Sequence, residues 1–326
     1  MNISNWFLEN IIKKIVVISI ISGVLSLSIP VRSQPVKEAH SSFRYDYLFS
    51  FQTKKDEDEK TYGNPRTLAV NSAENIYVVV PNAREIWVYN PKGSFLFSFG
   101  MKINDQEKVG RFSEPSGITI DDKDLVYVSD LDRDMVLIFS PEGEFRDEFP
   151  IFQPKGKTDA CAPFISFNAL KKLLYIPDPC TQKVNIYTNS GEFITSFGEM
   201  GLELGKFGGL ANCTFNKNGE LYIIDPGNFR VQFFSSNHQP INSFGVKGIK
   251  GGEFIRPYDI GIDSAERIFV SDFIQKSIHV FDSNGVFLSL IKEKDFIEPL
   301  GIAFSPENRL YIVDGEGQKI HVIQVD

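Results

Sequence analysis

Short apolar runs alternate with turn residues along most of this chain. The segment between residues 211 and 244 shows the pattern, with apolar runs at 211–215, 221–224, 230–234 and 241–244. A turn at Asn218-Gly219 separates the first two runs. Runs of this kind, rich in β-branched and aromatic residues and bounded by turn residues, predict strands joined by hairpins. We therefore expect four antiparallel strands here.

The same pattern recurs six times, with a period of about 47 residues. An aromatic residue occupies one position of the second strand in every copy, at Tyr77, Tyr127, Tyr175, Tyr222, Phe269 and Tyr311. An aspartate follows three residues later in five copies, as Asp130, Asp178, Asp225, Asp272 and Asp314. Six copies of a four-stranded unit predict an all-β fold, a six-bladed β-propeller.

The two ends of the repeat predict how the ring closes. The last copy ends at 322–326 after three strands, whereas 47–51, before the first copy, matches the outermost strands of other copies, such as 95–99 and 193–197. A closed ring leaves no unpaired strand edge at this point. We therefore expect the N-terminal strand to complete the last blade, with the propeller covering residues 43–326.

Residues 1–33 have the pattern of an export signal. Lys13 and Lys14 precede the apolar run 15–29, and Val31-Arg32-Ser33 places acceptable residues at the two positions that a signal peptidase reads. The run is short for a spanning helix, which needs roughly 20 residues. We expect cleavage after Ser33, with an uncleaved N-terminal anchor as the alternative. Residues 34–42 would be a linker, and the protein would be exported to a periplasmic, extracellular or lumenal compartment.

Composition supports a folded β-protein and limits its partners. Hydrophobic residues make up 42% of the chain and aromatic residues 13%, which suits a large core built from pleated surfaces. The formal net charge is −8. Nucleic-acid binding through a basic surface is therefore not expected.

Glycine-rich segments between the copies carry a family resemblance. Residues 244–257 resemble the beginning of an NHL repeat, and residues 221–234, with Asp225, Asn228 and Arg230, resemble the remainder of that repeat. The resemblance covers residues 43–326 and implies an NHL-type propeller, although the first and sixth copies lack the Asn-x-Arg element. The family includes extracellular sensor domains, ubiquitin-ligase interaction domains, RNA binders and a peptide-amidating lyase, so the resemblance leaves function open.

Two of the three cysteines predict a disulfide in the third copy. Cys161 precedes the innermost strand, and Cys180 lies in the loop between the second and third strands. In an up-and-down blade these two places lie at the same end, and an oxidising compartment favours their linkage. The alternative is two unrelated thiols. We expect Cys213 to be a buried, inert thiol.

Motifs for catalysis or metal binding are incomplete in this sequence. Residues 130–141 imitate a calcium loop, but Met135 stands where glycine is needed and Pro141 where glutamate is needed. The four histidines have no metal-ligand spacing: His40, His238, His279 and His321. The repeated aspartates are interpreted as turn residues that accept backbone N–H groups. No metal site and no cofactor are expected.

The beginnings of the innermost strands surround the predicted central channel. Arg66, Asn212, Tyr258 and Asp259 are polar at positions where packing alone would accept glycine, alanine or valine. Propellers bind ligands where the loops of all blades converge. These four residues are therefore candidate ligand-binding residues, with simple water contacts along the channel as the alternative.

These observations favour an exported, non-catalytic binding or scaffold module. We expect a monomer that presents one face of the ring to a protein, peptide or glycan, with a membrane tether if the N-terminal segment is not cleaved. The alternative is a metal-assisted hydrolase or lyase with its site at the channel mouth, near Asn212, Tyr258 and Asp259. An amidating lyase would need histidines on the innermost strands, and the sequence places none there.

Overall fold

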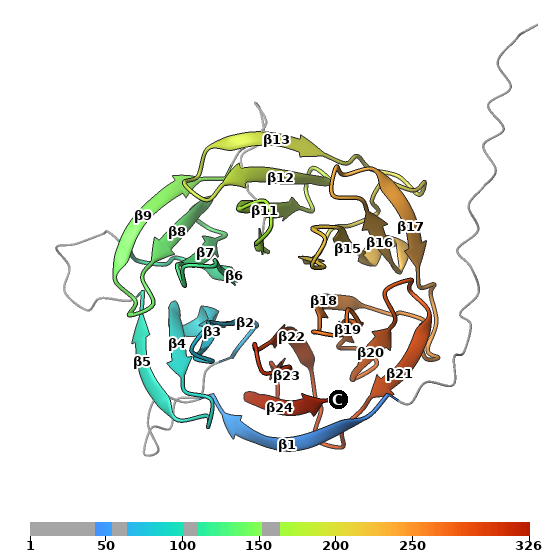
Figure 1. The fold of residues 1–326 in the computed structure, drawn as a ribbon. Helices are drawn as coiled ribbons and strands as arrows, with labels where there is room; N and C mark the ends of the chain where they lie inside the picture. Colours follow the sequence, from blue (N-terminus) through green and yellow to red (C-terminus); the bar gives the residue numbers. More distant parts are fainter. Residues whose placement is uncertain (1–42, 54–63, 101–109, 152–163) are drawn as a thin grey trace, which may run out of the picture. The chain divides into compact units, whose positions relative to one another are not determined.

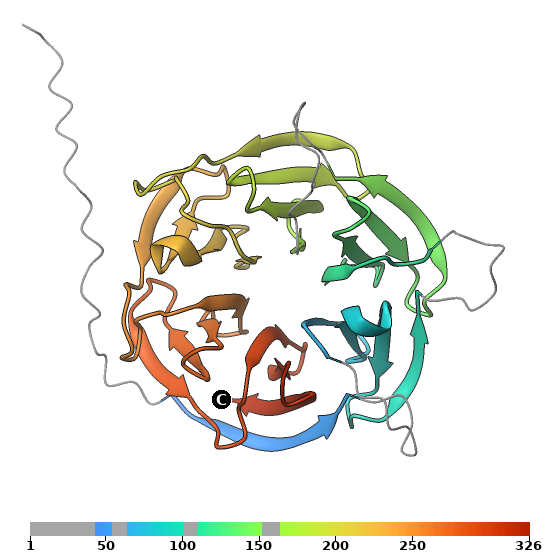
Figure 2. The same cartoon turned by 180° about the vertical axis from the view of Figure 1, so that it is seen from behind.

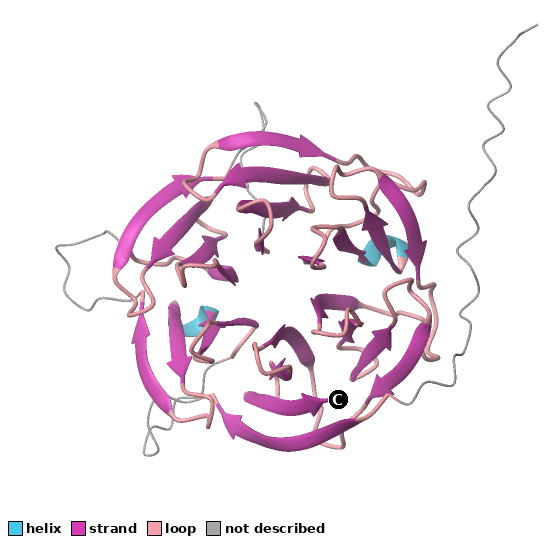
Figure 3. Ribbon diagram, in the orientation of Figure 1, coloured by secondary structure: helices cyan, strands magenta, loops and turns pink. Residues whose placement is uncertain are grey.

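The computed structural model of the protein describes residues 43–53, 64–100, 110–151 and 164–326. The strands in these residues form six four-stranded sheets, whose members pair antiparallel. The sheets stand around a central axis as the blades of a ring (Figure 1). Figure 3 shows that strands dominate, beside the short 3₁₀ helices η1 (Pro81–Ala83) and η2 (Pro226–Asn228). The predicted six-bladed propeller is confirmed.

Blades one to five each run from an innermost to an outermost strand in chain order. Blade one contains β2 (Thr67–Val70), β3 (Ile76–Val80), β4 (Glu85–Tyr89) and β5 (Phe95–Phe99). Blade two contains β6 (Pro115–Ile120), β7 (Val126–Asp130), β8 (Met135–Phe139) and β9 (Phe145–Pro150). Blade three contains β10 (Ser166–Asn168), β11 (Leu173–Asp178), β12 (Lys183–Thr188) and β13 (Phe193–Phe197).

The second half of the ring repeats this arrangement. Blade four contains β14 (Cys213–Phe215), β15 (Leu221–Asp225), β16 (Arg230–Phe234) and β17 (Pro240–Phe244). Blade five contains β18 (Pro257–Ile262), β19 (Ile268–Asp272), β20 (Ser277–Phe281) and β21 (Phe287–Ile291). Blade six contains β22 (Pro299–Phe304), β23 (Arg309–Asp314) and β24 (Lys319–Val325), and β1 (Tyr45–Gln52) is its outermost strand.

The ring is closed by pairing the first strand with the last. β1 runs antiparallel to β24, with Tyr47 opposite Ile323 and Phe51 opposite Ile320. Figure 2 shows β1, in blue, along the outer side of the red strands of blade six. The Tyr47 hydroxyl also forms a 2.9 Å hydrogen bond with Nδ1 of His321. The expected closure by the N-terminal strand is therefore confirmed.

Alternating side chains bury both faces of each blade. Tyr77 and Val79 of β3 belong to a cluster shared with blade two, whereas Val78 belongs to a cluster shared with blade six. This follows from the two-residue period of a strand, which points successive side chains to opposite faces. The six repeated aromatic residues are all at most 2% exposed. Burying a side chain of this size contributes about 2 kcal/mol.

Neighbouring blades also meet through a phenylalanine and a glycine at the outer rim. The Phe51 ring lies against Gly93, where an added Cβ would stand only 2.5 Å from the ring, and Phe99 lies against Gly143 in the same way. Both glycines have positive φ, a conformation that other residues rarely adopt. Blade four has His238 at this position, and its ring stacks on Phe197 with centroids 4.8 Å apart.

Several predictions from the sequence lie outside the described residues. They concern the export signal or anchor at 1–33, the linker at 34–42, and Cys161. Within the ranges that the structure describes, no helix combines the length and apolar character needed to cross a membrane.

Candidate functional site

Two cavities occupy the axis of the ring. The mouth cavity, of about 800 Å³, lies where the innermost strands begin, and the channel cavity, of about 460 Å³, follows those strands toward their ends. Among the described residues, the mouth cavity is lined by Asn64, Pro65, Arg66, Pro81, Asn82, Phe164, Tyr258, Phe273, Glu298, Leu300, Gly315 and Glu316. Its volume is within the range of small-molecule sites.

Arg66 brings an unpaired guanidinium to the mouth cavity. Its backbone is fixed between two blades, because its N–H donates to the Val79 carbonyl at 3.1 Å and its carbonyl accepts from the N–H of Gly301 at 3.2 Å. The side chain is half-buried. Within the described part of the chain, the guanidinium forms no hydrogen bond or ion pair. None of its five donors is therefore taken up by another of the described residues, and each can serve a ligand.

Tyr258 forms an aromatic wall with two phenylalanines. Its ring makes edge contacts with Phe164, at 5.4 Å between centroids, and with Phe273, at 6.1 Å. Burial raises the pKa of the Tyr258 hydroxyl above its ordinary value, and Arg66 opposes the rise. The phenol is therefore neutral at physiological pH, and it can donate or accept a hydrogen bond.

Two carboxylates complete the mouth cavity. Glu298 lies directly before β22, and Glu316 lies in the turn between β23 and β24. Burial, followed by the neighbouring carboxylate of Glu316, raises the pKa of Glu298, while Arg66 acts in the opposite direction. The cavity thus holds charges of both signs, contributed by blades one and six.

Asn212 and Asp259 lie in the channel cavity and are bonded to each other. Asn212 Nδ2 donates to Asp259 Oδ1 at 2.7 Å, and the backbone N–H groups of Ile260 and Ile302 donate to the same carboxylate at 2.8 and 2.9 Å. Asp259 is 1% exposed, and burial raises its pKa to about 6. This carboxylate therefore connects blades four, five and six. Of the four candidate ligand-binding residues, Arg66 and Tyr258 line the mouth cavity, whereas Asn212 and Asp259 line the channel cavity.

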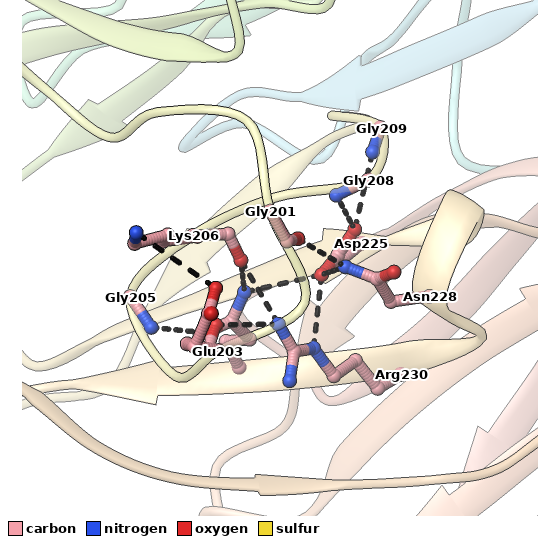
Figure 4. Close-up of polar contacts among 10 residues, drawn as sticks. Gly201, Glu203, Gly205, Lys206, Gly208, Gly209, Asp225, Asn228 and Arg230 are labelled. Atoms are coloured by element: carbon pink, nitrogen blue, oxygen red, sulfur yellow. Dashed lines mark hydrogen bonds and ion pairs between the residues drawn. The ribbon is translucent and has the colours of Figure 1, made fainter.

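The repeated aspartates hold the segments that lead into the innermost strands. Figure 4 shows Asp225 accepting the N–H groups of Gly208 and Gly209, at 2.8 and 3.2 Å, and also contacts from Asn228 and Arg230. Asp130, Asp272 and Asp314 accept two N–H groups at the equivalent places in their own blades.

Asp314, one of these repeated aspartates, holds a segment that lines the mouth cavity. Its carboxylate accepts the N–H of Ile297 at 2.7 Å and that of Glu298 at 3.0 Å. The backbone of Glu298 is therefore fixed at the rim, and the interpretation of these aspartates as backbone acceptors agrees with the structure.

Several side chains that line the mouth cavity were not predicted from the sequence, among them Phe164, Phe273, Glu298 and Glu316. Phe164 stands among the strand beginnings but was not selected, because it is apolar. The other three lie just before the repeated proline or just after the repeated aspartate. The repeat positions flanking Asp272, Pro299 and Asp314 would have identified them, because those loops open at the same end of each blade.

The cysteines occupy different environments. Cys180 is exposed in the turn after β11, and its N–H donates to Asp178 at 2.8 Å. Its predicted partner, Cys161, lies outside the described residues, so the disulfide stays a prediction. Cys213 is 2% exposed, and burial raises its pKa to about 12, as expected for an inert thiol.

Two buried histidines take part in hydrogen bonds that hold the blades. His279 Nδ1 accepts the N–H of Gly252 at 3.1 Å, the same role that Gln232 has toward Gly205 in blade four. Within the described ranges, no group of three or more His, Cys, Asp or Glu side chains could hold a metal ion.

Comparison with solved structures finds proteins of similar fold. A streptogramin B lyase superposes with a TM-score of 0.60, at 12% identity over 85% of this chain and 98% of that chain. An inactive variant of virginiamycin B lyase from Staphylococcus aureus, solved with quinupristin, gives 0.58 at 16% identity over 82% of each chain. A putative gluconolactonase gives 0.62 at 12% identity, over 85% of this chain and 92% of that chain.

These similarities concern the fold alone, because the identities are low. No protein-family model and no curated protein matches the sequence.

Proposed function

We propose that this protein is an exported, non-catalytic binding module that takes its ligand in the mouth cavity. The observation that carries the proposal is the guanidinium of Arg66, which is half-buried and unpaired among the described residues, beside the aromatic wall of Tyr258. Partly desolvating a cation without a partner costs free energy, and an anionic group of a ligand would offset that cost. A peptide, a glycan or a protein segment with such a group fits this site.

The NHL resemblance supports the architectural part of the proposal. Asp225, Asn228 and Arg230, which carry that resemblance, form one hydrogen-bonded cluster in blade four, with Arg230 Nε 2.9 Å from the Asp225 carboxylate. We propose on this basis that the propeller is of the NHL type. Export, with either cleavage after Ser33 or an N-terminal anchor, rests on the pattern of residues 1–33.

A metal-assisted hydrolase or lyase is the second candidate. It is favoured by the fold shared with streptogramin B lyase and with a putative gluconolactonase. However, both Asp259 oxygens are occupied by hydrogen bonds from the protein, and its partner Asn212 supplies one of them. Asn212 and Asp259, two of the three residues that this candidate would use, are therefore already employed in joining blades.

The test is a thermal-shift screen of the purified protein with amino acids, short peptides and oligosaccharides. A ligand at 100 times its Kd stabilises a protein by about 2.7 kcal/mol. Stabilisation by at least one compound should disappear in Arg66→Gln. The control is Arg146→Gln, because Arg146 is exposed on β9, outside the mouth cavity, and should retain the effect. Ligand shifts that are equal in both variants, or turnover of a bound compound, would overturn the proposal.

A further inference from the structure

The charges around the mouth cavity are arranged so that neither sign is neutralised by the other. Arg66 forms no ion pair with Glu298 or Glu316 among the described residues, yet it is close enough to oppose the rise in the pKa of Glu298. One guanidinium and two carboxylates therefore face the same space. A ligand that meets only one of these charges leaves the other without a partner.

This arrangement discriminates between classes of ligand. A phosphate dianion that bound Arg66 would be repelled by Glu298 and Glu316, while a simple amine that bound these carboxylates would be repelled by Arg66. A molecule that carries both a carboxylate and an ammonium group satisfies both sides. Its carboxylate matches the planar fork of a guanidinium, which can donate two parallel hydrogen bonds.

The apolar part of the cavity adds a preference for a flat ring. Tyr258 and Phe273 are both half-buried, so each presents part of its ring to the cavity, and Leu300 and Pro81 extend the apolar lining. The guanidinium of Arg256 lies over the Phe273 ring, 6.0 Å from its centroid. Aromatic rings pack favourably edge-to-face or offset against such a wall.

We infer that the mouth cavity binds a zwitterionic α-amino acid with an aromatic side chain. Arg66 donates to its carboxylate, Glu298 accepts from its ammonium group, and its ring packs against Tyr258. This inference rests on the proposed binding function and names the ligand class for the same cavity. The volume of about 800 Å³ accommodates such a molecule together with ordered water.

The experiment compares three probes by isothermal titration calorimetry. L-phenylalanine carries both charges, N-acetyl-L-phenylalanine lacks the cation, and L-phenylalaninamide lacks the carboxylate. L-phenylalanine should bind about 10-fold or more tightly than either derivative, because each derivative loses one charge-assisted hydrogen bond.

Two variants assign each charge to its residue. Arg66→Gln should lower the affinity for L-phenylalanine by about 10-fold or more and leave the affinity for the amide unchanged or improved. Glu298→Gln should lower the affinity for L-phenylalanine to a similar extent and leave the affinity for the N-acetyl derivative unchanged or improved. Arg146→Gln, on the outer strand β9, is the matched control and should bind all three probes as the wild type does.

The outcomes separate this inference from the proposed function. Equal affinity for the three probes, or loss of binding of both derivatives in both variants, would overturn the inference that the ligand is a zwitterion. If L-phenylalanine does not bind but another compound in the screen depends on Arg66, the inference fails and the binding function stands. If no compound depends on Arg66, both fail.

Discussion

The carboxylate of Asp259 joins three blades beside the channel. It accepts hydrogen bonds from Asn212 of blade four, from its own neighbour Ile260 and from Ile302 of blade six. A buried acceptor with three donors is costly to remove, because each donor would lose its partner. The role of Asp259 is therefore better explained by cohesion of the ring than by contact with a ligand.

This residue should give the protein a characteristic pH dependence. Burial places the folded-state pKa of Asp259 at about 6, above that of an exposed aspartate at about 4. The carboxyl therefore contributes stability at pH values below about 4, and this contribution is lost as the pH rises through about 6. Relative to Asp259→Asn, the wild type should lose about 2 kcal/mol of unfolding free energy between pH 4 and pH 7.

Denaturant titrations of both proteins at several pH values would measure this difference. Ligand binding at the mouth cavity should survive in Asp259→Asn, because Arg66 and Glu298 are untouched. A difference that does not change with pH would show that Asp259 has an ordinary pKa.

Single positions were predictable from the sequence only where their residue type was unexpected. Arg66 and Tyr258 stood out because apolar or small residues suffice at their places, and both line the mouth cavity. Asn212 and Asp259 stood out equally, yet their mutual hydrogen bond was not foreseen. They occupy the same repeat position in adjacent blades, which brings them together around the axis. Their hydrogen bond depends on how the blades are placed, which no single segment specifies.

At the level of the repeated element, blade two shows that the two repeat positions of the predicted disulfide lie next to each other. Ser113 and Asp132 stand in blade two where Cys161 and Cys180 stand in blade three. The Ser113 hydroxyl donates to the Asp132 carboxylate, so these two side chains meet.

Blade four supports the same conclusion from its backbone. The equivalent residues are Gly208 and Gly227, and a Cβ on Gly227 would collide with the Gly208 carbonyl. The two positions are therefore adjacent in two blades where both are described. This adjacency strengthens the prediction made from the sequence.

We predict that peptide mass spectrometry without reductant will show Cys161 linked to Cys180. Replacing both with serine should lower the unfolding free energy by about 3 kcal/mol, as expected for a disulfide that closes a loop of this length. Cys213 serves as the internal control, since it should resist alkylation until the protein unfolds. Two thiols at 161 and 180 that react freely with an alkylating reagent would contradict the prediction.

The bounds of individual strands were predicted less well than their order. The innermost strand of blade four was expected to span 211–215, but β14 begins at Cys213. Ala211 and Asn212 still exchange backbone hydrogen bonds with Ile224. The side chain of Asn212 turns to Asp259 and to the N–H of Cys213, so the chain enters the sheet irregularly. Apolar pattern alone does not register such a competing polar contact.

For the whole molecule, the pairing of β1 with β24 decides whether the ring is closed. This pairing, called the seam below, was predictable because the pattern of 47–51 matches the outermost strand that the last copy lacks. The structure adds the Tyr47 to His321 hydrogen bond, and it places His321 Nε2 3.4 Å from the Asp314 carboxylate. This polar chain ties the closing strand to the loop that holds Glu298.

Deleting residues 43–51 should therefore open the ring. The edge of β24 would lose its partner, and exposed edges of this kind promote aggregation. We expect loss of a large part of the roughly 5–15 kcal/mol that stabilises a typical domain, visible as a lower melting temperature and increased light scattering. Removing residues 34–42 instead is the control and should change neither. An unaffected melting curve in the deletion of 43–51 would refute the role of the seam.

The seam also sets an order on the maturation of the chain. Of the strands in the ring, Tyr45–Gln52 leaves the ribosome first and Lys319–Val325 last, so the earliest strand must wait for the synthesis of all the other strands before it finds its neighbour. Chains truncated before β24 would lack that neighbour and would keep an unpaired strand edge on β1. Only a chain synthesised through Val325 can pair this edge, so the fold distinguishes such chains from shorter translation products.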